Sequence, residues 1–137
     1  METLNKAVVV RFNKEVIEEG NPESFRELMD DNFVNHTAPA GMDNGPQGML
    51  YTFNNILRVA FPDIKVIIYD QIAEGDKVTT RKAITGTHTG PLFGIPPTYQ
   101  KITIDVIDIV KVKDGKYVEH WGMNSLPLLL AQLSKPD

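Results

Sequence analysis

The stretch Gly115-Lys116-Tyr117-Val118-Glu119-His120-Trp121 is the part of this chain that says most about its fold. A turn glycine leads into a strand that carries a carboxylate, an imidazole and the only tryptophan at successive positions. Tryptophan is costly to expose and large enough to wall a cavity, and histidine can transfer protons near neutral pH. The stretch therefore predicts a small, cup-like structure built on strands, with proton-handling groups inside it.

A second stretch, Gly86-Thr87-His88-Thr89-Gly90, ends a long strand pattern upstream and places another imidazole between two glycines. Glycine permits tight turns and close approach of the backbone. Two readings of His88 stay open, a catalytic imidazole or a side chain that locks the bend into the proline-rich loop over 91–98.

Length and composition set limits on the class of protein. The chain has 137 residues, 42% of them hydrophobic, which is typical of one domain spanning 1–137. The net charge is −4 and the basic residues are scattered, so we expect no nucleic-acid partner. No apolar run approaches the roughly 18–20 residues that span a bilayer, and the first residues lack signal-peptide features. We therefore expect a cytoplasmic protein with no membrane partner.

Helical periodicity comes first along the chain and strand periodicity follows. Apolar spacing and Gly or Pro boundaries predict helices over 4–20, 22–29, 46–61 and 126–133. Alternation and turn residues predict strands over 33–37, 64–72, 77–88, 102–112 and 117–123. This order is typical of an α+β fold in which helices cover one face of a curved, mainly antiparallel sheet.

Three phrases resemble a known family. They are Phe61-Pro62-Asp63, the 86–90 stretch with Phe93-Gly94-Ile95-Pro96-Pro97-Thr98, and Asp114-Gly115-Lys116 leading to Glu119-His120-Trp121. With the order of elements, they resemble the SnoaL-like polyketide cyclase or ester cyclase group of the nuclear transport factor 2-like superfamily. The resemblance implies a cone-shaped α+β barrel and cofactor-free closure of polyketide rings by intramolecular aldol condensation.

The chain departs from that family at one position. The characterised cyclases carry an acid/base aspartate four residues after the tryptophan, and Ser125 stands there in this sequence. Serine alone is a poor base, so another group must take the proton if the protein is an enzyme. Ser125 could instead cap the last helix.

Strand alternation places Tyr117, Glu119, Trp121, Met123 and Ser125 on one face of the last strand. The resemblance puts the tryptophan face toward the cavity, so we expect Glu119 inside, with a raised pKa suited to acid/base catalysis. The alternative is a structural Glu119 paired with Arg81 or Lys111. His120, on the opposite face, is then expected to contact a helix layer or a subunit interface.

His36 lies where a strand enters the loop at the expected cavity mouth, and it is a candidate base or a turn residue that bonds local backbone. The candidate catalytic residues are therefore Glu119, His36 and His88. The histidines and carboxylates show no metal-ligand spacing, so we predict neither a metal nor a cofactor.

The expected ligand contacts are aromatic, thioether and hydroxyl side chains, namely Trp121, Tyr51, Phe93, Met123 and Ser125. Asp105 and Asp108 lie on opposite faces of one strand, so at most one of them faces inward.

Two functions remain open. The first is a cofactor-free enzyme that removes an acidic C–H proton from a small apolar carbonyl compound. The second is a non-catalytic binding protein for a small apolar molecule that keeps the cup and has lost the acid; epoxide hydration or ketosteroid isomerisation is a less favoured third. The outer sheet face predicts a homodimer or a higher homo-oligomer.

Overall fold

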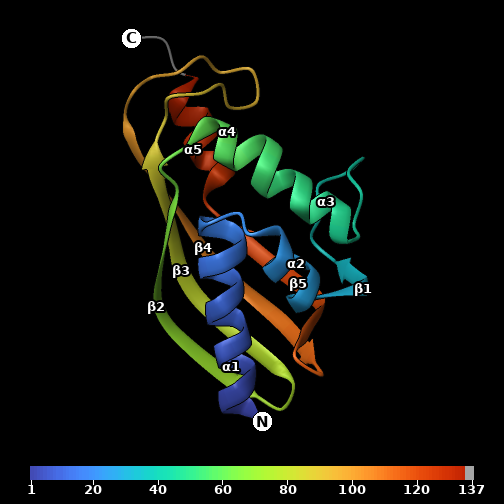
Figure 1. Ribbon diagram of the computed structural model, residues 1–137. Helices are drawn as coiled ribbons and strands as arrows, with labels where there is room; N and C mark the ends of the chain where they lie inside the picture. The colour runs from blue at the N-terminus through green and yellow to red at the C-terminus, as the bar shows by residue number, and fades with distance from the viewer. Residues whose placement is uncertain (135–137) are drawn as a thin grey trace.

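A computed structural model describes residues 1–134 of the chain (Figure 1). The first helix runs as α1 (Glu2–Arg11) into π-helical turns, η1 (Phe12–Glu18), and ends at Gly20, whose φ is +68°. After it, α2 (Pro22–Leu28) is capped by Asn21, whose side chain accepts hydrogen bonds from two backbone N–H groups. The predicted stop at glycine and the predicted helix start at Pro22 are both confirmed.

The second long helix is built the same way, from α3 (Pro46–Tyr51), η2 (Thr52–Leu57) and α4 (Arg58–Ala60). A last helix, α5 (Leu126–Leu133), follows the sheet. Within residues 1–134, no helix is long and apolar enough to cross a membrane.

Five strands form one open sheet in the order β1-β5-β4-β3-β2. They are β1 (Met29–Asn35), β2 (Lys65–Glu74), β3 (Lys77–Thr87), β4 (Lys101–Lys113) and β5 (Lys116–Asn124). All neighbouring strands are antiparallel except β1, which runs parallel to β5. β1 starts at Met29, four residues before the predicted strand, since the preceding helix ends at Leu28.

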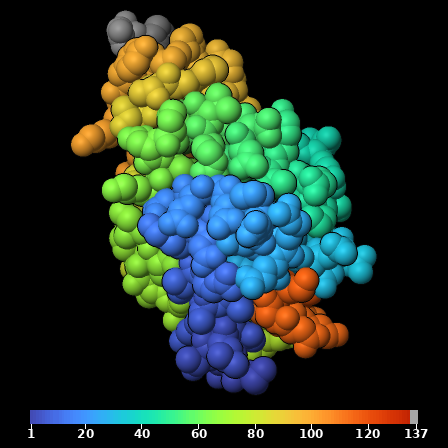
Figure 2. Space-filling view, viewed as in Figure 1, coloured from blue at the N-terminus to red at the C-terminus, as the bar shows by residue number. Residues whose placement is uncertain are grey.

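The core lies between the helices and one face of the sheet (Figure 1). Figure 2 shows the helices covering this face, with the second long helix (green) lying across the upper end of the first (blue). Even-numbered residues of β3 and β4 point into the core and odd-numbered ones point away. The buried apolar residues include Val9, Phe12, Val16, Phe53, Leu57, Phe61, Val78, Ile84, Ile104, Val110 and Val112.

Gly86 and Gly90 allow the close approach that their spacing predicts. A Cβ atom at Gly86 would lie 2.6 Å from Cβ of Phe61, and one at Gly90 would overlap the backbone of Val59. The end of β3 and the following loop can therefore pack directly on the end of the second long helix.

Candidate active site

An apolar cavity of about 210 Å³ lies between the long helices and the inner face of the sheet. Its walls are mainly aliphatic and aromatic, including Phe12, Ile17, Met49, Phe53, Ile56, Leu57, Ile84, Ile104 and Val106. Phe93 and Pro39 reach it from two loops, and Leu126 from the start of α5. Its ionisable side chains, Lys82, Asp108, Tyr117 and His120, come from β3, β4 and β5, and Thr52 adds a hydroxyl from η2.

Two of these ionisable side chains form a buried ion pair. Nζ of Lys82 lies 3.2 Å from Oδ2 of Asp108, and the two residues are only 4% and 5% exposed. Lys82 comes from β3 and Asp108 from β4, both on the inward face. Nζ of Lys82 also donates to Oδ1 of Asn13 at 2.6 Å, and Asn13 in turn donates to the carbonyl of Val9.

The charge of Asp108 is stabilised despite its burial. Burial alone would raise the pKa of this carboxyl, but the Lys82 ammonium and the contact with His120 outweigh it and hold the pKa below its usual value. Asp108 is thus a carboxylate at neutral pH. Its Oδ1 atom is buried without a hydrogen-bond partner among the described residues.

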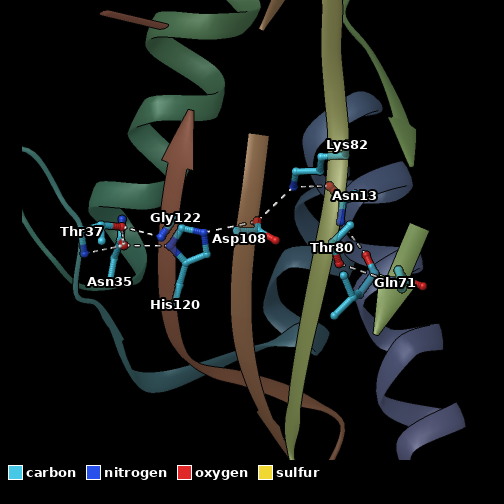
Figure 3. A network of polar contacts seen from close by, with 10 residues as sticks. Asn13, Asn35, Thr37, Gln71, Thr80, Lys82, Asp108, His120 and Gly122 are labelled. Carbon is cyan, nitrogen blue, oxygen red and sulfur yellow. Dashed lines mark hydrogen bonds and ion pairs between the residues drawn. The ribbon is translucent and has the colours of Figure 1, made fainter. Parts of the chain in front are cut away.

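His120 continues the network across β5 (Figure 3). Its Nε2 lies 3.4 Å from Oδ2 of Asp108, and its Nδ1 lies 2.9 Å from Oδ1 of Asn35. The backbone N–H of Thr37 donates to that same Asn35 atom, which must therefore be an acceptor. Because Oδ1 can only accept, Nδ1 of His120 carries a hydrogen, and Nε2 is the ring atom that faces the carboxylate.

Two neighbours fix the position of the His120 ring. The hydroxyl of Thr37 donates to Oδ1 of Asn35 and accepts from the N–H of Gly122, which ties the β1 end to β5. A Cβ atom at Gly122 would lie 2.8 Å from Cε1 of His120. Glycine at 122 therefore leaves the space that the imidazole occupies.

Tyr117 adds a phenol to the cavity wall. Its ring stacks on Phe12 with centroids 4.0 Å apart. Burial, and then the charge of Asp108, raise the pKa of Tyr117 well above its usual value. The hydroxyl therefore remains protonated and can act as a hydrogen-bond donor.

The predicted residues Glu119 and Trp121 lie on the opposite, outer face of the sheet. This placement corrects the expectation that the tryptophan face lines the cavity. Tyr117 pairs with Val112 and Glu119 pairs with Lys111, so Val118 is an extra residue in β5 and forms a bulge. Beyond the bulge the alternation is reversed, and His120 points inward instead of Glu119.

Glu119 and His36 do meet, but outside the cavity. Nε2 of His36 lies 2.9 Å from Oε1 of Glu119, and the His36 ring stacks on Trp121. The bond to His36 lowers the pKa of Glu119, contrary to the expected increase. Glu119 also pairs with Lys111 at 3.6 Å, as its structural alternative predicts, whereas Arg81 pairs with Asp70. The catalytic roles of Glu119 and His36 stay predictions.

His88 is fully buried and bonds the proline-rich loop. Its Nδ1 accepts from the backbone N–H of Thr98 and lies 2.9 Å from that residue's hydroxyl. Its Nε2 has no partner among residues 1–134, and the side chain is not part of the cavity wall. This geometry matches the bend-locking alternative for His88, and a catalytic role stays a prediction.

Of the expected ligand contacts, only Phe93 lines the inner cavity. Tyr51 is 53% exposed and Met123 is 81% exposed. Trp121, Met123 and Ser125 line a groove on the outer face. Ser125 stands at the start of α5 without capping it, because its hydroxyl accepts from the N–H of Asp105.

Sequence reasoning did not single out Lys82, Asn13, Asn35 or the inward position of His120. For Lys82 the sequence does hold a signal. Val78, Thr80, Lys82 and Ile84 occupy alternate positions of one strand, which places the lysine on the same face as core residues. Asp108 was one of two open alternatives; Asp105 is the exposed one. No group of three or more potential metal ligands occurs within residues 1–134.

The helices on one face of an open, mainly antiparallel sheet, with a cavity between them, define a nuclear transport factor 2-like α+β protein. The family model described as SnoaL-like polyketide cyclase matches residues 7–133. The chain therefore belongs to the SnoaL-like polyketide cyclase family, as its sequence motifs predict.

Solved structures agree with this assignment. A candidate polyketide cyclase from Bacillus cereus is 34% identical, with a TM-score of 0.81, over 96% of this chain and 80% of that chain. IdmH, a candidate polyketide cyclase from Streptomyces antibioticus, is 28% identical, with a TM-score of 0.83, over 96% and 99%. A SnoaL-like protein from Jannaschia is 25% identical, with a TM-score of 0.82, over 99% and 95%. No curated protein matches the chain.

Proposed function

We propose that this protein is a cofactor-independent acid/base enzyme that acts on a small, largely apolar carbonyl compound bound in the inner cavity. The observation that carries the proposal is the buried Lys82–Asp108–His120 cluster on the wall of an otherwise apolar pocket. Isolated buried charges are costly, so a charged cluster facing a cavity is a strong candidate for chemistry.

The proton acceptor in this proposal is Asp108. Its carboxylate takes a proton from a carbon between two carbonyl groups, and the C–H electron pair moves onto a carbonyl oxygen to give an enolate. The Tyr117 hydroxyl and the cationic Lys82 supply positive potential for that oxygen. The enolate carbon then attacks a second carbonyl of the same molecule, and this new carbon–carbon bond closes a ring. The alkoxide that forms takes the proton back from Asp108.

The low pKa of Asp108 limits the substrates it can deprotonate. A weak base removes protons only from strongly activated carbon acids, such as the carbon between two carbonyls. Holding that carbon against the carboxylate in a dry pocket then supplies the remaining rate advantage.

Hydrogen exchange at an activated carbon tests the proposal whatever the natural substrate is. An aryl 1,3-diketone in D₂O is monitored by NMR, and the wild type is expected to accelerate exchange at the central carbon over the buffer rate. Asp108→Asn is expected to reduce this acceleration by about 10²-fold or more. The matched control is His36→Ala/Glu119→Gln, which alters the outer-face pair and is expected to leave the acceleration intact.

The reverse pattern would assign catalysis to Glu119 and His36, as the sequence motifs predict. If both variants keep the full acceleration, neither Asp108 nor the Glu119–His36 pair is responsible for catalysis. The alternative function is a non-catalytic binding protein, which Ser125 at the family acid position favours. In that case the cavity binds apolar ligands and the wild type produces no acceleration.

A further inference from the structure

We infer that the cavity selects an uncharged ligand that donates a hydroxyl hydrogen to Oδ1 of Asp108. The ligand class is a phenol, or an enol of similar size, with an apolar ring system. This inference rests on the proposed function for the location of the site, and it adds the group that the site recognises.

The first argument is the unsatisfied acceptor. Within residues 1–134, the two side-chain nitrogens that contact Asp108, Nζ of Lys82 and Nε2 of His120, both lie against Oδ2. Oδ1 is buried and has no partner within residues 1–134. Buried carboxylate oxygens are normally hydrogen-bonded, because leaving one unpaired forfeits its hydration. A donor from a bound molecule would satisfy this atom.

The second argument is charge. An anionic group presents acceptor atoms and no hydrogen to donate, so it is not expected to bind at a carboxylate oxygen. An ammonium ligand could donate, but it would lie beside Lys82, whose Nζ is within 3.2 Å of the same carboxylate. The other residues lining the cavity carry no formal carboxylate or ammonium group. A neutral hydroxyl is the donor that fits this balance.

The third argument is size and wall chemistry. An apolar cavity of about 150 Å³ binds benzene. The cavity here is somewhat larger, about 210 Å³, and its walls include Phe12, Phe53 and Leu57. A substituted ring or a pair of fused rings therefore fits, with its apolar body against the helices and its hydroxyl at β4.

The test compares three probes that share one ring system: 2-naphthol, its methyl ether and 2-naphthoate. Binding to the full-length wild type is measured by calorimetry at neutral pH. The naphthol is expected to bind about tenfold tighter than the ether, since a hydrogen bond to a buried carboxylate is charge-assisted. The ether keeps the ring but has no hydrogen to donate.

The variants assign that preference to one oxygen. Asp108→Asn keeps the shape and removes the charge, and the preference for naphthol is expected to fall to about twofold or less. The matched control is Asp105→Asn, on the outer face of the same strand, which is expected to keep the full preference. If Asp108→Asn does not fold, the ether comparison in the wild type still decides.

Three outcomes overturn the inference: equal affinity for naphthol and ether, tighter binding of the naphthoate, or no binding of any probe. These results are independent of turnover. Selective naphthol binding without exchange activity would keep the ligand class and reject the enzyme, and exchange activity without naphthol selectivity would do the opposite.

Discussion

Lys82 and Asp108 form an ion pair in which Nζ and Oδ2 are 3.2 Å apart and both side chains are almost fully buried. The preceding residue of β3, Arg81, points outward and pairs with Asp70 at 2.9 Å, with both side chains more than half exposed. One strand thus carries a buried and an exposed ion pair at adjacent positions. Their environments predict very different contributions to stability.

Lys82→Met is expected to destabilise the fold by about 3–5 kcal/mol, because it leaves the Asp108 charge buried without its cation. The matched variant Arg81→Met removes the exposed pair and is expected to cost about 0–1 kcal/mol. Urea denaturation at neutral pH measures both. Similar midpoints for the two variants would show that the buried pair is not a structural requirement.

Acid stability is expected to depend on Asp108. Its folded-state pKa lies below the unfolded value, so its stabilising effect is present above about pH 4 and is lost as the pH falls through the folded value. The carboxylates of Glu15, Glu18 and Asp63 have lowered pKa values too and add to the same trend. The informative quantity is therefore the difference between wild type and Asp108→Asn.

That difference in unfolding free energy is expected to be largest near neutral pH and to shrink on acidification toward about pH 3. Denaturation curves at several pH values measure it. A difference that stays constant with pH would mean that the pKa of Asp108 is the same in the folded and unfolded protein, and a difference that grows on acidification would mean that folding raises it.

The fold could be predicted from the sequence because each element has a local signal. Apolar residues recur at helical spacing before Gly20 and at strand spacing after Asp63, and Gly75 and Gly115 adopt positive φ in the hairpin turns. These signals depend on a few neighbouring residues. The order of helices and strands, and the face that the helices cover, follow from them.

The site could not be predicted in the same way because it depends on register. A one-residue bulge at Val118 reverses the faces of β5, and nothing in the local pattern marks it. Tyr117 and His120 therefore share the inner face although they are three residues apart. The contact between Lys82 and Asp108 also requires the pairing of β3 with β4, where Lys82 is opposite Val106.

Asn35 is expected to control which ring nitrogen of His120 carries hydrogen. In the wild type the amide oxygen accepts from Nδ1 at 2.9 Å, so Nε2 faces Asp108. Asn35→Ala removes that acceptor and is expected to give a mixture of ring tautomers, visible in the ¹⁵N shifts of His120. Asn35→Asp retains an acceptor and is expected to retain the Nδ1–H form.

Thr37→Val is the control for this prediction. It removes the hydroxyl that bonds Asn35 and Gly122 and leaves the Asn35–His120 bond in place. The turn is expected to lose about 0.5–1.5 kcal/mol while the ¹⁵N shifts stay those of the wild type. Tautomer mixing in Thr37→Val as well would assign the effect to the general loosening of the turn.

The outer face of the sheet is the surface on which we expect a second copy of the chain to bind. The apolar residues exposed there are Ile67, Tyr69, Ile72, Ile107, Ile109 and Met123. Four of them, Tyr69, Ile107, Ile109 and Met123, line a groove of about 870 Å³ together with Trp121. Burying exposed apolar side chains stabilises an association by about 25 cal/mol per Å² before the costs of association.

Ile107 lies near the middle of this surface and points outward from β4. Ile107→Asp is therefore expected to convert a wild-type dimer into a monomer, because it would bury a carboxylate between two apolar faces. Val59→Asp is the matched control, since Val59 is also exposed but lies on α4, on the helical side of the protein. It is expected to leave the dimer intact. Light scattering at micromolar concentration measures the mass of each variant, and a monomeric wild type would refute this interface.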